Sequence, residues 1–280
     1  MQISNNGGVL DPMGGVRFIG VVHLLALPGA PRYAGSMARV LDAAVRDAAA
    51  LSSGGANAVI VENFGDAPFH AGAVDPETVA AMALAVERVI GEVGGAMPVG
   101  VNVLRNDARA ALGLAAACGA RFVRINVHAG AAVSDQGLLE GRAAETLRAR
   151  AALFPDPATR PALLADVHVK HAAPLGDSEI GLAALDTHLR GLADGLIVSG
   201  AGTGAGADPR DLARVRAVLP TVPLFVGSGF TPQSAATLFA AAGTGAPLGA
   251  IVGTYLKRDG NLSEPVDPAR VAAVAALFRA

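Results

Sequence analysis

The sequence predicts a single-domain α/β protein of the (β/α)₈ TIM-barrel class. Short Val- and Ile-rich segments alternate with longer helical segments eight times, and no linker or shift in composition marks a domain boundary. The 280 residues are close to the length of roughly 250 that is usual for this barrel. We expect a loose lead-in over residues 1–15 and the barrel over 16–280. The alternative is a doubly wound open sheet, which usually carries a Gly-rich fingerprint after its first strand; here that strand runs into His23-Leu24-Leu25 instead.

The eight predicted strands are nearly continuous apolar runs, which is typical of parallel strands covered by helices. They span residues 17–23, 57–62, 98–104, 121–128, 162–170, 194–199, 222–228 and 249–253.

The segments between the strands carry helix start and stop signals. The first helix follows Ser36 and stops at Gly54-Gly55, a typical C-terminal cap. Four later helices begin with a capping residue and then proline, whose missing N–H has no intrahelical partner at that position. These starts are Asp75-Pro76, Asp208-Pro209, Thr231-Pro232 and Asp267-Pro268. The other three helices follow Asn106-Asp107, span about 138–153 and span about 178–192.

Composition excludes several classes of protein. Hydrophobic residues make up 52% of the chain and the net charge is only −2, which excludes disorder and disfavours nucleic-acid binding. Cys118 is the only cysteine, so a disulfide scaffold is excluded. The apolar runs are shorter than the about 20 residues of a membrane span, and the N-terminus does not resemble a signal peptide. We therefore expect a cytoplasmic protein with no membrane span, and on general grounds a homo-oligomer.

Polar residues gather where the predicted strands end. In a barrel, alternate side chains point inward and the carboxyl ends of the strands hold the active site. Asp166, His168 and Lys170 follow one another at period two, so we expect them to share one inward face. Carboxylates and amines that converge on one concave face are what acid–base chemistry requires. The predicted catalytic residues are Glu62, Asn102, Asn126, Asp166, His168 and Lys170.

Other interpretations of these charges stay open. Glu62, Arg124, Asp166 and Lys170 could instead form a structural layer of buried ion pairs, because isolated buried charges are costly. A desolvated Lys170 could form a Schiff base with a carbonyl substrate. A metal site made by Glu62, Asp166 and His168 has no support from spacing motifs. We expect no cofactor, and a divalent metal is not excluded.

Glycine is concentrated after the last three predicted strands. Glycine lets backbone N–H groups approach an anion, and in barrels the loops after strands 7 and 8 frequently bind phosphate. The alternative is that these are only tight turns. The predicted phosphate-binding residues are Ser199, Gly200, Gly202, Thr203, Gly227, Ser228, Gly229, Gly253 and Thr254. Lys257 and Arg258 could add positive charge there or lie at a solvated helix end.

Three loops are long enough to cover a site at this end of the barrel. They span residues 24–35, 63–74 and 129–137. A moving lid and a static loop are both compatible with their mixture of Gly, Pro and polar residues.

The motifs at the strand ends resemble one family. They include the segments 20–29, 62–69, 100–107, 124–127, 134–137, 166–171, 227–229 and 253–259. Over about residues 17–275 the chain resembles the BtpA/SgcQ family, which is grouped with ribulose-phosphate-binding-type barrels. The resemblance implies that the predicted catalytic residues belong to the family's motifs. It also implies lid or orienting roles for a second group of residues. Together with Arg124, this group consists of His23, Asn63, Asp66, Arg105 and Asp135.

Two functions follow from the residues and the resemblance. The first is an enzyme that acts on a phosphorylated small molecule, a sugar phosphate or a nucleotide-like ribose phosphate. Isomerisation, aldol-type cleavage and glycosidic cleavage all fit such a site. The alternative is a non-catalytic assembly or stability factor for a larger complex, because the family's namesake is associated with photosystem I biogenesis.

Overall fold

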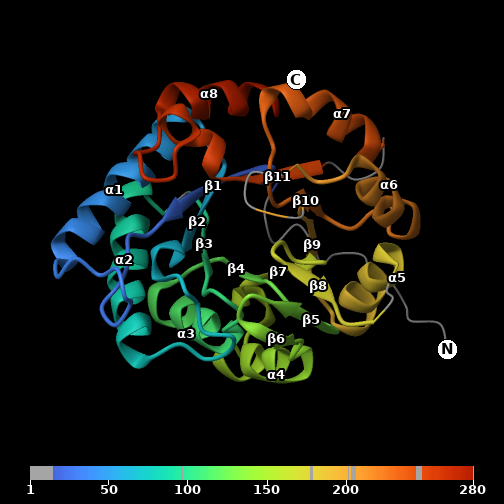
Figure 1. Ribbon diagram of the computed structural model, residues 1–280, viewed down its shortest axis with the longest axis horizontal. Coiled ribbons are helices and arrows are strands. Elements are labelled where there is room, and N and C mark those ends of the chain that lie inside the picture. The colour runs from blue at the N-terminus through green and yellow to red at the C-terminus, as the bar shows by residue number, and fades with distance from the viewer. Residues whose placement is uncertain are drawn as a thin grey trace.

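The computed structural model describes residues 15–95, 97–176, 179–200, 202, 206–243 and 248–279. Eight parallel strands close into a barrel in the order β1-β11-β10-β9-β7-β4-β3-β2, with helices around it (Figure 1). The strands are β1 (Phe18–His23), β2 (Ala58–Glu62), β3 (Val99–Asn102), β4 (Phe122–Ile125), β7 (Ala162–Val167), β9 (Gly195–Val198), β10 (Leu224–Val226) and β11 (Leu248–Val252). The predicted TIM barrel is confirmed. Residues 1–14 of the predicted lead-in lie outside the described residues.

The described residues form eight α-helices around the barrel, six of which begin directly after a capping residue that the sequence predicts. They are α1 (Met37–Gly54), α2 (Pro76–Val93), α3 (Ala108–Cys118), α4 (Ala143–Leu153), α5 (Ile180–Leu185), α6 (Pro209–Val218), α7 (Pro232–Ala242) and α8 (Pro268–Ala276). Gly55 ends α1 with φ at 93°, a conformation that favours glycine. Thr231 caps α7 in a reciprocal pair with Ser234. None of the described helices has both the length and the apolar character needed to cross a membrane.

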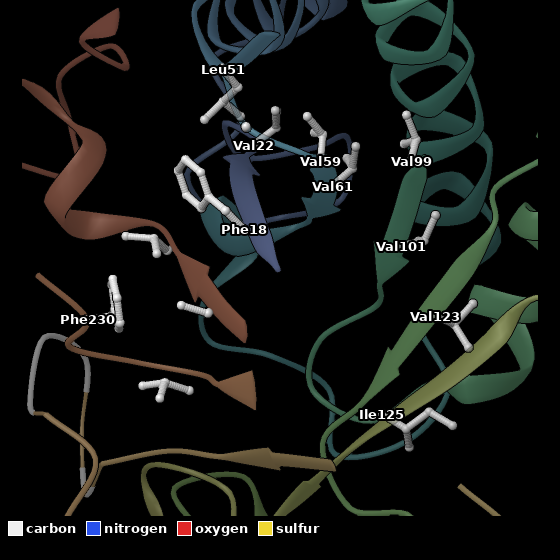
Figure 2. Packing of buried hydrophobic residues seen from close by; sticks show 14 of the residues in the cluster. Phe18, Val22, Leu51, Val59, Val61, Val99, Val101, Val123, Ile125 and Phe230 are labelled. Carbon is white, nitrogen blue, oxygen red and sulfur yellow. The ribbon is translucent and has the colours of Figure 1, made fainter. Parts of the chain in front are cut away.

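The apolar core has two layers, one on each side of the barrel wall. The outer layer lies between strands and helices, and Figure 2 shows Val22, Val59 and Val61 in it beside Leu51 of α1. The inner layer fills the barrel and includes Phe122 and Phe225. A Cβ at Gly100 would lie 2.2 Å from the ring of Phe122, so glycine provides the space for that ring. The inner side chains are apolar up to the carboxyl ends of β1, β2, β3, β4 and β7, where the last inward position is polar.

A small antiparallel sheet was not predicted. It has the order β6-β5-β8 and consists of β5 (Ala131–Ser134), β6 (Gly137–Glu140) and β8 (Ala172–Pro174). The segment 129–137, predicted as an open loop, is therefore largely a hairpin strand, and the helix predicted from about 138 begins at Ala143. Ala132 and Leu139 pack one face of this sheet on Val127 and Val169.

The fifth barrel strand is shorter than predicted. β7 ends at Val167 rather than at Lys170, and His168 has φ at 56°, outside the extended range. The period-two alternation therefore stops at Asp166, and the shared inward face predicted for Asp166, His168 and Lys170 is wrong beyond that residue.

Candidate active site

Arg124 lies at the centre of a buried polar cluster at the carboxyl end of the barrel. Its Nε and Nη2 donate to the two oxygens of Asp166 at 2.8 and 2.9 Å, and its Nη1 donates to Oε1 of Glu62 at 3.2 Å. Each of the three residues occupies the last inward-facing position of its strand, at 3–5% exposure. The buried ion pairs of the structural interpretation are therefore present between Arg124 and both Glu62 and Asp166.

Three neutral side chains complete the hydrogen bonds of the two carboxylates. Asn102 Nδ2 donates to Glu62 Oε1 at 3.0 Å, and Asn126 Nδ2 donates to Asp166 Oδ2 at 3.2 Å. Ser199 Oγ donates to Asp166 Oδ1 at 3.0 Å. Asp166 thus accepts four hydrogen bonds, whereas Glu62 Oε2 accepts none from the described residues and lies 4.0 Å from His23 Nε2. Glu62 is the carboxylate with an oxygen left for a ligand.

The charges of the cluster hold one another in the ionised state. Burial alone would raise the pKa of Glu62, but Arg124, His23 and Lys170 together lower it below its ordinary value. Burial would lower the pKa of Arg124, but Asp166 and Glu62 raise it. Glu62 is therefore a carboxylate at neutral pH, ready to accept a proton or a hydrogen bond.

Lys170 reaches the same site from the turn that follows β7. Burial, and then the neighbouring Arg124, lower the pKa of its ammonium group. Among the described residues, Lys170 Nζ makes no hydrogen bond and no direct ion pair. Lys170 therefore combines an unengaged amine with an environment that disfavours its charge.

Two cavities border the cluster. One, of about 170 Å³, is lined by the loops after β10 and β11. The other, of about 340 Å³, lies over the ends of β2, β3 and β4. Both are lined by Glu62, Phe64, Arg124 and Lys170. A ligand that fills both cavities would pass directly over the charged groups.

The smaller cavity contains most of the predicted phosphate-binding residues. The predicted residues among those that line it are Gly227, Ser228, Gly229, Gly253 and Thr254. Thr231, the cap of α7, lines it too, so the start of an 11-residue helix lies at its wall. A Cβ at Gly253 would lie 2.6 Å from Cε1 of His23, so only glycine fits there without displacing the ring.

The described part of the loop after β9, which was also predicted to bind phosphate, supports neighbouring residues and does not line the smaller cavity. Ser199, Gly200 and Gly202 line neither of the two cavities, and Thr203 lies outside the described residues. Ser199 donates to Asp166, and the Gly200 N–H donates to Ser228 Oγ at 2.7 Å. The described part of this loop therefore supports the neighbouring residues.

Neither Lys257 nor Arg258 lines the smaller cavity. Lys257 is buried at 3% exposure and its Nζ contacts Asp47 Oδ2 at 2.5 Å, so it neither lines the cavity nor lies at a solvated helix end. Arg258 is exposed and 3.9 Å from Glu264. Arg270, which sequence reasoning missed, lines the smaller cavity from α8, with its guanidinium 4.4 Å from the centre of the Tyr255 ring. No local pattern identifies Arg270, because only the packing of α8 brings it to the cavity.

His168 lies away from the two cavities. It lines a separate space of about 40 Å³ with Asn126, Asp166 and Val169. Burial lowers its pKa, while Asp211 and Glu179 act in the opposite direction. The positive φ at His168 removes its side chain from the inward series, which explains why it does not join Lys170.

Two of the predicted orienting residues, Asn63 and Asp66, hold the loops in place. Asp66 accepts hydrogen bonds from Leu27 N at 2.8 Å and from Asn63 Nδ2 at 3.0 Å. Asn63 Oδ1 accepts from Leu104 N at 2.7 Å, so the loops after β1, β2 and β3 are bonded together. These contacts favour static loops over a moving lid at residues 24–35 and 63–74.

His23, Arg105 and Asp135 surround the ligand space. Burial lowers the pKa of His23 to about 4, so its imidazole is neutral at pH 7. Arg105 lines the larger cavity, and its Nη2 donates to the backbone oxygen of Lys170. Asp135 is exposed at the turn between β5 and β6 and lines the larger cavity from above.

The described residues contain no group of three or more His, Cys, Asp or Glu side chains that could hold a metal ion. Glu62 and Asp166 share Arg124 between them, which is the geometry of an ion-pair network.

Comparison with known proteins identifies relatives over nearly the whole chain. The model of the BtpA family matches residues 16–280. The chain is 47% identical over 255 residues to the Photosystem I biogenesis protein BtpA of Synechocystis sp., covering 91% of this chain and 85% of that protein.

Solved structures share the barrel at much lower identity. (S)-3-O-geranylgeranylglyceryl phosphate synthase from Thermoplasma acidophilum, in complex with its substrate sn-glycerol-1-phosphate, superposes with a TM-score of 0.58 at 16% identity. That match covers 95% of this chain and 94% of the synthase. OMP decarboxylase of Leishmania donovani gives a TM-score of 0.56 at 18% identity, covering 96% of each chain. At these identities the likeness is one of fold.

Proposed function

The chain belongs to the BtpA family, and from that premise we propose that it is an enzyme acting on a phosphorylated small molecule at the carboxyl end of the barrel. The observation that carries the proposal is the position of Glu62 and Lys170. Both line the cavity at the Gly-rich loops and the cavity over β2, β3 and β4. A substrate with its phosphate in the first cavity would place its carbon chain beside an accepting carboxylate oxygen and an unengaged amine.

The smaller cavity is suited to a phosphate group. Gly229 and Gly253 bring backbone close to the ligand space, and the start of α7 adds the positive end of a helix dipole. Arg270 adds a full positive charge, and guanidinium–phosphate hydrogen bonds are among the stronger polar contacts in proteins. The synthase complex with sn-glycerol-1-phosphate supports the idea that this fold accommodates phosphorylated substrates.

The reacting groups are Glu62 and Lys170. Proton transfer by a positioned side chain contributes about 10²–10⁴-fold to a rate, and both of these groups have free capacity beside the ligand space. Asn102 and Arg124 hold Glu62 in place, while Arg105 holds the backbone of Lys170. A sugar phosphate or nucleotide-like ribose phosphate is the substrate class that we propose.

The engagement of Asp166 discriminates among the reactions. Glycosidic cleavage uses two carboxyl groups, one of them a proton donor. Each oxygen of Asp166 already accepts two hydrogen bonds, and Asp166 lines neither of the two cavities. The arrangement therefore favours isomerisation or aldol-type cleavage, in which one carboxylate and one amine suffice.

A second candidate function is a role in the assembly of a larger complex, as the name of the Synechocystis relative suggests. One observation favours it. Val133 and Leu138 face each other across β5 and β6 on the outer face of the small sheet, at 50% and 49% exposure. Leu175, at 62% exposure, follows β8 in the same sheet. Apolar side chains grouped on an exposed face are typical of contact surfaces.

Ligand-dependent stability distinguishes the two candidates. Inorganic phosphate, glycerol 3-phosphate and ribose 5-phosphate are compared with glycerol and ribose by thermal unfolding. A ligand present at about 100 times its Kd stabilises the fold by about 2.7 kcal/mol. We expect a rise in Tm with the phosphorylated compounds only, weakened in Arg270→Gln and unchanged in Arg258→Gln, whose side chain is exposed. Equal effects of ribose and ribose 5-phosphate, or no effect of any compound, would contradict the enzyme proposal.

A further inference from the structure

We infer that Lys170 acts as a nucleophile and forms an imine with the carbonyl carbon of a phosphorylated aldehyde or ketone. This inference rests on the proposed function and names the substrate class for it. Four features carry it: the turn that presents Lys170, the charge balance of the cluster, the free state of Nζ and the position of Glu62.

The turn after β7 places the side chain of Lys170 at both cavities. His168 and His171 lie on either side of it and have φ at 56° and 58°, a region that side chains other than glycine seldom occupy. Between them, Val169 is anchored at 4% exposure among Val127, Ala132 and Leu139. A left-handed backbone on both sides of a two-residue segment has an energetic cost that local packing must offset. Because of this turn, Lys170 does not continue the inward face of β7 and lines the ligand space instead.

Two further contacts fix the same turn. Arg105 Nη2 donates to the backbone oxygen of Lys170. Immediately after the turn, β8 pairs with β5 in the small sheet, at Ser134 with Ala172 and at Val133 with Ala173. The backbone of Lys170 is therefore held from both sides, which gives its side chain the fixed position that a nucleophile requires.

The charges around Lys170 balance without it. The groups that act on its amine are Arg124, Glu62, Asp166 and Arg105. Two guanidiniums offset two carboxylates, so a proton on Lys170 adds a surplus positive charge to a buried cluster. Burial and Arg124 lower the pKa of Lys170 accordingly. A neutral amine is the form that attacks a carbonyl.

The amine of Lys170 and one carboxylate oxygen of Glu62 are both available to a ligand in the cavities. Lys170 Nζ makes no hydrogen bond or direct ion pair with the described residues and lines both cavities, so its lone pair is available to a ligand. Glu62 lines both cavities too, and its Oε2 is not taken by Arg124 or Asn102. The nucleophile and a proton carrier thus lie beside the same ligand space.

Imine formation at Lys170 conserves atoms and charge. Nζ loses one ammonium proton to Glu62 and attacks the carbonyl carbon, so that a C–N bond forms and the C=O π pair moves to oxygen. A proton passes from nitrogen to that oxygen, giving a carbinolamine. Glu62 returns its proton to the hydroxyl group, which leaves as water while the nitrogen lone pair forms C=N⁺. Ammonium and carbonyl thus become iminium and water, with no change in total charge.

The small number of lysines in the chain allows an imine to be assigned to one residue. The sequence contains two lysines, Lys170 and Lys257. Lys257 is buried and paired with Asp47. An imine on a lysine can therefore be assigned to one of two peptides, and Lys257→Arg, which keeps the positive charge opposite Asp47, is a matched control.

The experiment traps the imine with borohydride in the full-length protein. Dihydroxyacetone phosphate and ribose 5-phosphate are the carbonyl probes, and glycerol 3-phosphate is the control without a carbonyl group. We expect a stable adduct with the mass of the probe less one oxygen atom, located on the Lys170 peptide. The adduct should be lost in Lys170→Arg and Lys170→Met, retained in Lys257→Arg, and suppressed by excess inorganic phosphate.

The outcomes separate the two proposals. If the carbonyl phosphates raise Tm but leave no adduct on Lys170, the imine is refuted and the phosphate site stands. If the adduct persists in Lys170→Arg, or forms equally on Lys257, the nucleophile is not Lys170. If neither inorganic phosphate nor any probe raises Tm or leaves an adduct, the proposed function itself fails. Trapping in the wild-type protein keeps the inference testable even if a Lys170 variant does not fold.

Discussion

Arg124 and Asp166 form a two-point contact across neighbouring barrel strands, with Nε and Nη2 donating at 2.8 and 2.9 Å to the two carboxylate oxygens. Arg124 is on β4 and Asp166 on β7, and the same guanidinium reaches Glu62 on β2 through Nη1. One cation therefore holds carboxylates from two other strands at the level where the apolar interior ends. A paired guanidinium of this kind fixes geometry that a flexible ammonium would not.

Removal of Arg124 should be strongly destabilising. Arg124→Met leaves Glu62 and Asp166 buried without their main counter-charge, which typically costs about 3–5 kcal/mol. Urea denaturation measures the free energy of unfolding of this variant and of Arg142→Met. Arg142 is mostly exposed and lies 3.5 Å from Glu145, so its loss should change stability by less than about 1 kcal/mol. Equal stability of the two variants would show that the cluster does not contribute as described.

The pH dependence of stability should carry a contribution from His23. Burial lowers its pKa from 6.5 to about 4 in the folded protein. Between these values the unfolded chain binds a proton that the folded chain does not, so stability falls as pH decreases from 6.5 and levels off below 4. The shift corresponds to about 3 kcal/mol.

The His23→Gln variant isolates that contribution, because it removes the titrating group while other histidines remain. Unfolding free energies of the wild type and the variant are compared at several pH values between 4 and 7. The difference between the two curves should change across this range in the direction stated above. Parallel curves would mean that His23 is accessible to protons in the folded state.

Substitution of Gly253 should damage the smaller cavity. The Cβ of Gly253→Ala would lie 2.6 Å from the His23 ring, so the ring or the loop after β11 must move. We expect lower stability and weaker binding of inorganic phosphate, measured by denaturation and calorimetry. Gly113→Ala is the matched control, because Gly113 lies inside α3 with nothing within 4 Å of its Cβ position. Alanine there should stabilise the protein by about 0.5–1 kcal/mol. A Gly253→Ala variant that binds phosphate normally would remove this cavity from the site.

The barrel and the strand residues of the polar cluster could be predicted from sequence because both follow from local periodicity. Strand alternation places Glu62, Asn102, Arg124 and Asp166 on inward positions, and all four meet at the mouth of the barrel. Capping pairs such as Thr231-Pro232 locate the helices that surround it.

The sequence analysis misplaced or missed several residues because their positions depend on tertiary contacts, which local sequence patterns do not report. His168 and Lys170 continue the alternation in sequence, but a left-handed residue that is not glycine interrupts it, and no local pattern indicates such a residue. Lys257 finds its counter-charge in Asp47, 210 residues away in the chain. Arg270 enters the site only through the packing of α8 against the loop after β11. Each of these depends on tertiary contact between distant segments.

The most direct test of the account is a crystal structure of the wild-type protein soaked with inorganic phosphate. The account predicts a phosphate ion in the smaller cavity, within hydrogen-bonding distance of Arg270 and of the loops at Gly229 and Thr254, with Glu62 and Lys170 beside it. An empty cavity at saturating phosphate, or a phosphate bound only at another place on the molecule, would contradict it.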